Sequence, residues 1–418
     1  MINTSTKGRP LRVCFVSAHL FYHSIGKMMV QLLAFLQRTN WDSSAGLGDE
    51  YNADVHAIFM DKTLKSAGQV PGEGGQEGGG RSSSTSGGRV DQVTQALDQH
   101  LGPRFKRVKD SMKELSELLE RGQFDWIIYL DLGMEFTTYL TSAARLAPYQ
   151  AVWWGHPITS GLPNVDYFFG LNVESINAQN YYTEQHIRMF EMNSAPLSPL
   201  VNEDRETYAK YDLYNSKIDE SNGYVYEPKD IHVKEPYLMI IGRLFKIHPI
   251  MDIVLKRILQ ASPHGRIILV AELSDSTNSE TWSRMVKSIA DPDIYNRIWF
   301  IDYSHYSEVL LGARGVLDTF PYGGCLTTHD SLSNGVPLVT LPPEHVRGRY
   351  SLGMYNQINH MDLVAHNTSH YVSIASRLLN DISYWRKQTT DLRYKWKDMN
   401  HNKKVATEWL QFMRKVSD

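Results

Sequence analysis

Cysteine is scarce in this chain of 418 residues, in which Cys14 and Cys325 are the two present. Two cysteines exclude a disulfide framework and a zinc site built from cysteines. No apolar run approaches the roughly 20 residues of a membrane-spanning helix. The polar first residues also lack the apolar core of a signal peptide. From these absences we expect a protein of the cytoplasm or nucleus that does not contact a membrane.

Charge of one sign is not in excess either, since the formal net charge is −3. That balance argues against a nucleic-acid partner. The sequence also lacks the Gly-x-Gly-x-x-Gly and Gly-x-x-x-x-Gly-Lys-Ser/Thr loops. Two common ways of binding nucleotides are therefore excluded, and any nucleotide site must be built differently.

Short apolar segments alternate with amphipathic segments along most of the chain. Strands are expected at residues 12–17, 55–60, 125–130, 150–154, 165–169, 237–242, 266–271, 297–301, 316–319 and 337–341. Helices are expected at residues 26–38, 92–100, 110–121, 248–260, 281–290 and 328–334, and from 368 onward. This alternation predicts parallel sheets with helices on both faces. Because the length exceeds that of one core, we expect an α/β fold of two Rossmann-like domains facing a cleft.

Composition sets the expected domain boundaries. The first domain is expected over residues 10–200 and the second over 235–380, with C-terminal helices over 381–418 packing back on the first. Residues 66–90 are almost all Gly, Ser and polar, which predicts a disordered surface insertion. The polar, Tyr-rich stretch 197–235 is expected to connect the domains.

A turn rich in glycine and threonine follows the expected strand at 316–319. Gly323 and Gly324 would let a phosphate approach the backbone, and the amides of a helix start would meet its charge. Thr327 and Thr328 add hydroxyl donors, and Asp330 could accept hydrogen bonds from a ribose. The same residues could instead form only a glycine turn and a threonine helix cap. The Gly-Val-Pro that returns the chain into a strand favours a nucleotide-diphosphate site.

Other polar side chains follow strands, where open α/β sheets bind their ligands. Lys246 follows the first strand of the second domain, where it could neutralise a departing diphosphate; Arg243 is a weaker candidate for that task. His19 and His23 follow the first strand of the chain and could accept a proton near neutral pH, although a loop histidine is more often structural.

Two further segments point less clearly to a functional site. His156, in a turn that also contains Thr159, follows another strand and could reach a substrate. Asp291-Pro-Asp293 superficially matches an Asp-x-Asp metal signature, but a proline turn explains it better. We therefore predict no metal site.

These segments, in this order, resemble the catalytic region of the O-GlcNAc transferase family, glycosyltransferase family 41, with its Spindly-type relatives. The resemblance spans roughly residues 10–400 without the insertion. It rests on RVCFVS at 12–17 followed by His23, PYQAVWWGHPITSG at 148–161, LFKIHP at 244–249, and CLTTHDSL with GVPLVTLP within 325–342.

The resemblance implies a metal-independent, inverting glycosyltransferase of the GT-B architecture that needs no cofactor. Its donor would be UDP-GlcNAc or another UDP-hexose, and its acceptor a protein Ser/Thr hydroxyl. Catalytic residues would be His23 and Lys246. The donor-binding residues that the resemblance implies are Gly324, Thr327, Thr328 and Asp330. From their positions after strands, Gly323 and Arg243 are further donor-binding candidates, and His19, His156 and Thr159 are the expected acceptor-side residues.

Three alternatives remain open: a GDP-fucose-dependent protein O-fucosyltransferase, a non-catalytic nucleotide-sugar-binding protein, and a sugar phosphorylase. The sequence also departs from the family. It shows no tetratricopeptide repeats before the matched region and no bulky domain between its halves. The family's His/Arg signature near the nucleobase is not recognisable in residues 303–314, and His248 replaces the aspartate of the LYKIDP turn. The departure at 303–314 leaves the nucleobase open.

Overall fold

The computed structural model describes residues 6, 8–37, 52–64, 89–192, 235–271, 277–399 and 404–418. The chain divides into two compact units. The first comprises Met1–Asn172, Ile176–Leu197 and Asn402–Asp418, and the second Val173–Ser175 and Ser198–His401. Except for residues 89–90 and 235, the predicted insertion at 66–90 and the predicted connection at 197–235 lie outside the described residues.

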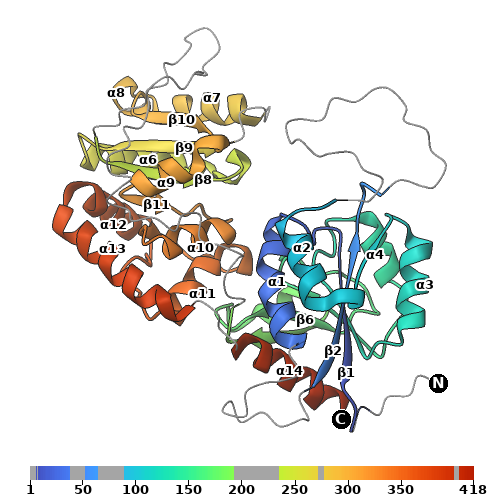
Figure 1. The fold of residues 1–418 in the computed structure, drawn as a ribbon. Helices are drawn as coiled ribbons and strands as arrows, with labels where there is room; N and C mark the ends of the chain where they lie inside the picture. Colours follow the sequence, from blue (N-terminus) through green and yellow to red (C-terminus); the bar gives the residue numbers. More distant parts are fainter. Residues whose placement is uncertain are drawn as a thin grey trace, which may run out of the picture. The chain divides into compact units, whose positions relative to one another are not determined.

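The first unit is built on a seven-stranded parallel sheet (Figure 1). Its spatial order is β3-β2-β1-β4-β5-β6-β7. The strands are β1 (Leu11–Ser17), β2 (Ala53–Met60), β3 (Phe105–Val108), β4 (Trp126–Tyr129), β5 (Tyr149–Trp153), β6 (Tyr167–Leu171) and β7 (Gln185–Met189). The accompanying helices are α1 (Ser24–Gln37), α2 (Gln92–Leu101), α3 (Met112–Gly122) and α4 (Phe136–Ser142).

The second unit has a five-stranded parallel sheet of order β10-β9-β8-β11-β12. Its strands are β8 (Tyr237–Ile241), β9 (Arg266–Ala271), β10 (Ile298–Asp302), β11 (Gly315–Leu317) and β12 (Leu338–Val339). Its helices are α6 (Pro249–Ala261), α7 (Thr277–Ile289), α8 (Pro292–Tyr295), α9 (Tyr306–Gly312), α10 (Leu326–Ser333), α11 (Tyr350–Gln357), α12 (Thr368–Asn380) and α13 (Ile382–Trp396).

The predicted α/β class with two Rossmann-like units is confirmed. Central strands such as β4 and β8 are buried at every position, as expected for parallel strands covered on both faces. Such strands form near-continuous apolar runs, which is the pattern that predicted them. Within the described residues no helix is long and apolar enough to cross a membrane.

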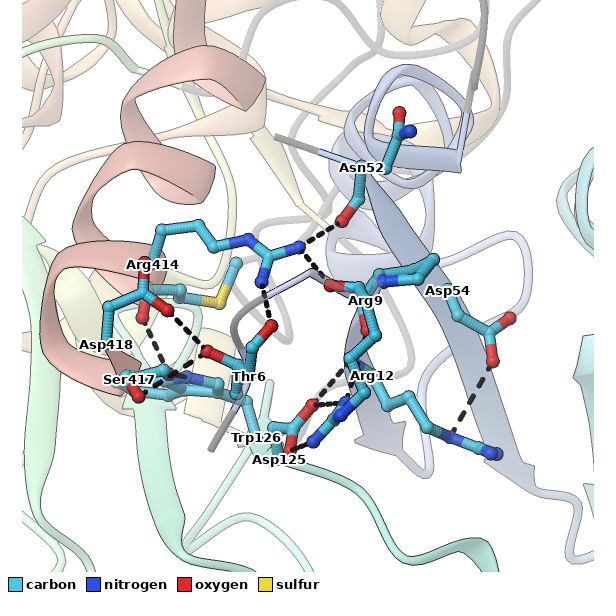
Figure 2. Close-up of polar contacts among 12 residues, drawn as sticks. Thr6, Arg9, Arg12, Asn52, Asp54, Asp125, Trp126, Arg414, Ser417 and Asp418 are labelled. Carbon is cyan, nitrogen blue, oxygen red and sulfur yellow. Dashed lines mark hydrogen bonds and ion pairs between the residues drawn. The ribbon is translucent and has the colours of Figure 1, made fainter. Parts of the chain in front are cut away.

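The C-terminal helix α14 (Lys404–Ser417) belongs to the first unit, whereas α12 and α13 belong to the second. The indole of Trp409 stacks on Phe169 of β6, with ring centroids 4.4 Å apart. Near the helix end, the guanidinium of buried Arg414 donates to the carbonyls of Thr6, Arg9 and Asn52 (Figure 2). These contacts hold α14 against the first unit and join residues near both ends of the chain.

Candidate active site

A buried carboxylate anchors the glycine turn of the second unit. Asp318, directly after β11, accepts hydrogen bonds from the Gly324 amide at 2.8 Å, the Thr340 hydroxyl at 2.8 Å and the Ser351 hydroxyl at 2.6 Å. A Cβ atom at Gly323 would come within 3.0 Å of the same carboxylate. Burial raises the pKa of Asp318, while these hydrogen bonds act in the opposite direction. The Gly324 amide is thus used inside the turn.

The helix that follows this turn begins without a side-chain cap. Cys325 precedes α10, and no side-chain hydrogen bond caps the helix there. The amides of its first turn have no acceptor within the helix. The buried Thr328 hydroxyl contacts the Gly324 carbonyl at 3.0 Å and the Ser351 hydroxyl at 2.9 Å, whereas Thr327 is half-buried. Of the two threonines, Thr327 is therefore the better placed to offer its hydroxyl to a ligand.

Lys246 lies beside the same turn. It ends a short 3-10 segment (Leu244–Lys246), and its ammonium lies 4.3 Å from the centre of the Tyr322 ring. Burial lowers the pKa of Lys246, and the attraction of Asp318 opposes that shift. Arg243, just before this segment, is exposed. A half-buried cation next to a glycine turn is suited to a diphosphate.

His248 caps the helix that follows this segment. Its Nδ1 accepts the Ile250 amide at 3.2 Å and so caps α6. An aspartate would cap a helix in the same way, which explains how histidine is accommodated here. Asp291 likewise caps α8 by accepting the Asp293 amide at 3.1 Å, in agreement with the predicted proline turn.

Two tyrosines that sequence reasoning missed lie next to Asp330. The Tyr306 hydroxyl donates to buried Asp330 at 3.0 Å. The Tyr303 ring stacks on Tyr306 at 5.1 Å with an interplanar angle of 7°, and Tyr303 is 47% exposed. Both follow β10, so the carboxyl edge of this sheet presents an aromatic face beside a carboxylate. Their place after a strand, where such sheets bind ligands, is the signal that could have identified them.

In the first unit, a buried carboxylate again fixes the residues after the first strand. Asp131, which follows β4, is fully buried. One of its oxygens accepts from the Ser17 hydroxyl at 2.8 Å and the Ala18 amide at 2.9 Å, and lies 2.6 Å from His19 Nδ1. The His23 ring lies 4.5 Å from that of His19. Burial, reinforced by the neighbouring His19, lowers the pKa of His23 to about 4.

The other two predicted acceptor-side residues lie in the turn after β5. Burial lowers the pKa of His156, whose ring is close to Gly133. The Thr159 hydroxyl donates to Glu184 at 2.7 Å, and the same buried carboxylate accepts the Ser160 amide at 2.7 Å. The Thr159 hydroxyl is therefore engaged in holding the turn.

Each unit thus carries one group of predicted residues at the carboxyl edge of its sheet. Lys246, the glycine turn and Asp330 lie in the second unit, and the three histidines lie in the first. This pair of Rossmann-like units defines the class: the fold is that of the GT-B glycosyltransferases. No protein-family model matches the chain.

Individual relatives narrow the similarity further than the fold does. The chain is 25% identical over 386 residues to a tomato (Solanum lycopersicum) protein named probable UDP-N-acetylglucosamine–peptide N-acetylglucosaminyltransferase SPINDLY, covering 91% of this chain and 36% of that protein. The barley (Hordeum vulgare) protein of the same name is 26% identical over 404 residues, covering 94% and 36%. The chain thus spans about a third of the length of these relatives.

Solved structures agree with this similarity. An O-GlcNAc transferase mutant from Thermobaculum terrenum matches with a TM-score of 0.73 at 22% identity, covering 100% of this chain and 70% of that one. Anabaena Alr3699/HepE, solved with UDP and glucose, matches with a TM-score of 0.51 at 10% identity, covering 97% and 99%. Together with the plant relatives, the Thermobaculum match confirms the predicted resemblance to the O-GlcNAc transferase family.

Proposed function

We propose that the chain transfers a sugar from a nucleotide-diphosphate donor to a hydroxyl acceptor. The observation that carries this proposal is the glycine turn held by Asp318 with Lys246 beside it. In such a reaction the protein does little covalent work. It orients the acceptor and stabilises negative charge on the leaving diphosphate.

In this proposal Lys246 and the first amides of α10 receive the diphosphate, with the Thr327 hydroxyl as a further donor. Asp330 accepts from the ribose, and the exposed face of Tyr303 stacks on the nucleobase. The proposed donor is UDP-GlcNAc and the proposed acceptor a protein Ser/Thr hydroxyl, by similarity to the plant and Thermobaculum proteins. Inversion and independence from metal ions are part of the same proposal.

GDP-fucose is a second candidate donor. The residues after β10 present stacked tyrosines, and an aromatic face accepts any base because every base has a π-face. A panel of UDP- and GDP-sugars, assayed for transfer and for hydrolysis, separates the two donors. Phosphate-dependent release of a sugar phosphate would instead indicate a phosphorylase.

Lys246→Met tests the leaving-group role, because methionine keeps the aliphatic stem and removes the charge. We expect turnover to fall by a factor of about 100 or more, the scale of losing one charged transition-state contact, with little change in melting temperature. Lys287→Met, at an exposed lysine of α7 in the same unit, is the matched control. Normal turnover in Lys246→Met contradicts the role. Nucleotide-sugar binding without transfer or hydrolysis by the unaltered chain would instead support a non-catalytic binding protein.

A further inference from the structure

The two neighbouring histidines of the first unit are held in different ways. His19 Nδ1 lies 2.6 Å from the carboxylate of Asp131. A carboxylate accepts hydrogen bonds, so Nδ1 of His19 carries the proton and Nε2 has the free lone pair. His23 Nδ1 instead accepts the backbone amide of Ile25 at 3.3 Å. In neutral His23 the proton is therefore on Nε2, and this nitrogen is a donor.

We propose that His19, positioned by Asp131, is the general base that takes the acceptor proton, and that His23 donates a hydrogen bond from Nε2. This inference rests on the proposed glycosyl transfer. It departs from the resemblance, which places His23 in the catalytic role. It also assigns a positioning role to Asp131, which sequence reasoning did not single out.

The surroundings of His19 support its role as the base and that of His23 as a hydrogen-bond donor. Asp131 is fully buried, and its second oxygen has no hydrogen-bond partner among the described residues. Its charge is therefore little screened and can stabilise an imidazolium on His19, as the aspartate does in a Ser-His-Asp triad. The side chain of His19 is itself 14% exposed, so it is not fully enclosed. His23, by contrast, is kept neutral, because burial and the neighbouring His19 lower its pKa.

Several charged side chains among the described residues lie near the pair. Glu135 Oε1 lies 4.0 Å from His19 Nε2 and is itself ion-paired with Lys62 at 2.5 Å. Further titratable groups near these side chains are His156 near Asp131, and Lys27 and Arg89 near His23. Because Lys62 already pairs with Glu135, the carboxylate that fixes the orientation of His19 is Asp131.

The proposed step is balanced. The acceptor O–H gives its proton to His19 Nε2 while its oxygen bonds to the anomeric carbon. The bond from that carbon to the diphosphate oxygen breaks, and its electron pair leaves with the nucleotide diphosphate. The His19 imidazolium, which is hydrogen-bonded to Asp131, then releases its proton to solvent.

Paired substitutions in the full chain test the assignment. His19→Asn keeps a donor toward Asp131 but has no base at Nε2, so kcat should fall 100- to 10,000-fold, with the donor KM unchanged and the acid limb of the pH–rate profile lost. His23→Gln keeps a donor near Nε2 and should lose less than tenfold. Asp131→Asn can retain the accepting oxygen without the charge, and should lower kcat and move the acid limb to lower pH. His56→Gln, at a histidine of β2 paired with Asp54, is the unaffected control.

Nitrogen NMR of the histidine rings supplies a readout that does not depend on activity. We expect the Nδ1–H tautomer for His19 and the Nε2–H tautomer for His23, with Asp131→Asn altering the titration of His19 more than that of His56. The opposite tautomers, full turnover in His19→Asn, or a loss in His23→Gln as large as that in His19→Asn would overturn the assignment. If the unaltered chain transfers sugar from no donor, the proposed function fails, and the role of His19 in transfer fails with it.

Discussion

At the scale of residues, three buried carboxylates hold the turns that carry the candidate site. Asp131 fixes His19, Glu184 fixes the turn at Thr159, and Asp318 fixes the glycine turn. Asp131 accepts a hydrogen bond from a residue more than 100 positions away in the sequence, and Asp318 accepts one from a residue 33 positions away. A local pattern cannot reveal such pairs. What the sequence does show is that Asp131 directly follows the expected strand at 125–130 and that Asp318 lies within the expected strand at 316–319.

His329 is a residue whose burial has a measurable consequence. It lies on α10 against Trp396, and neither of its ring nitrogens has a hydrogen-bond partner among the described residues. Burial lowers the pKa of His329 to about 3. A neutral histidine that is protonated only after unfolding costs stability as the pH falls below its unfolded pKa of about 6.5.

We therefore predict that His329→Leu makes the stability of the protein less sensitive to acid. Between about pH 6 and pH 4, the free energy of unfolding of the unaltered chain should fall by up to about 1.4 kcal/mol per pH unit more than that of the variant. Urea unfolding at several pH values measures this difference. Parallel curves for the two proteins would show that His329 is protonated equally in both states.

At the scale of elements, the central strands and most helices could be predicted because their apolar periodicity is strong. The strands that sequence reasoning missed, β3 and β7, are the two edges of the first sheet. Each is only partly buried, and their sequences FKRV and QHIRM contain charged residues. Edge strands carry less apolar pattern because only one side is paired and coverage is incomplete.

The join between β1 and α1 offers a test at this scale. Gly26 lies in the first turn of α1, and a Cβ atom there would overlap the carbonyl oxygen of Phe21. Without a clash, alanine would favour the helix by up to about 1 kcal/mol. We predict that Gly26→Ala is instead destabilising by about 1–3 kcal/mol and displaces the loop that carries His19 and His23.

Chemical denaturation and turnover together check this prediction. Ser24→Ala, an exposed position in the same helix, is the control and should be close to neutral. Increased stability of Gly26→Ala with unchanged turnover would mean that the loop does not depend on this close approach.

At the scale of the whole molecule, the two-unit architecture followed from the repeated alternation of strands and helices. The expected return of the C-terminal helices over residues 381–418 to the first domain is seen for α14, whereas α13 belongs to the second unit. The return of α14 depends on the stacking of Trp409 on Phe169 and on Arg414 binding three backbone carbonyls. Both join residues that are more than 200 positions apart. The individual residues that α14 contacts could not be predicted, because they lie far from it in the sequence.

Each unit carries its own group of candidate residues. The second unit carries the residues proposed for the donor, and the first carries those proposed for the acceptor. In the second unit, the glycine turn and Lys246 are proposed to receive a diphosphate. Binding of a diphosphate there does not depend on which sugar, acceptor or base takes part.

Calorimetric titration of the full chain with nucleoside mono- and diphosphates tests this claim most directly. We predict that UDP or GDP binds at least tenfold more tightly than the matching monophosphate, and that Lys246→Met removes most of this difference while Lys287→Met retains it. Equal affinity for the mono- and diphosphate, or no binding of either nucleotide by the unaltered chain, would contradict the account.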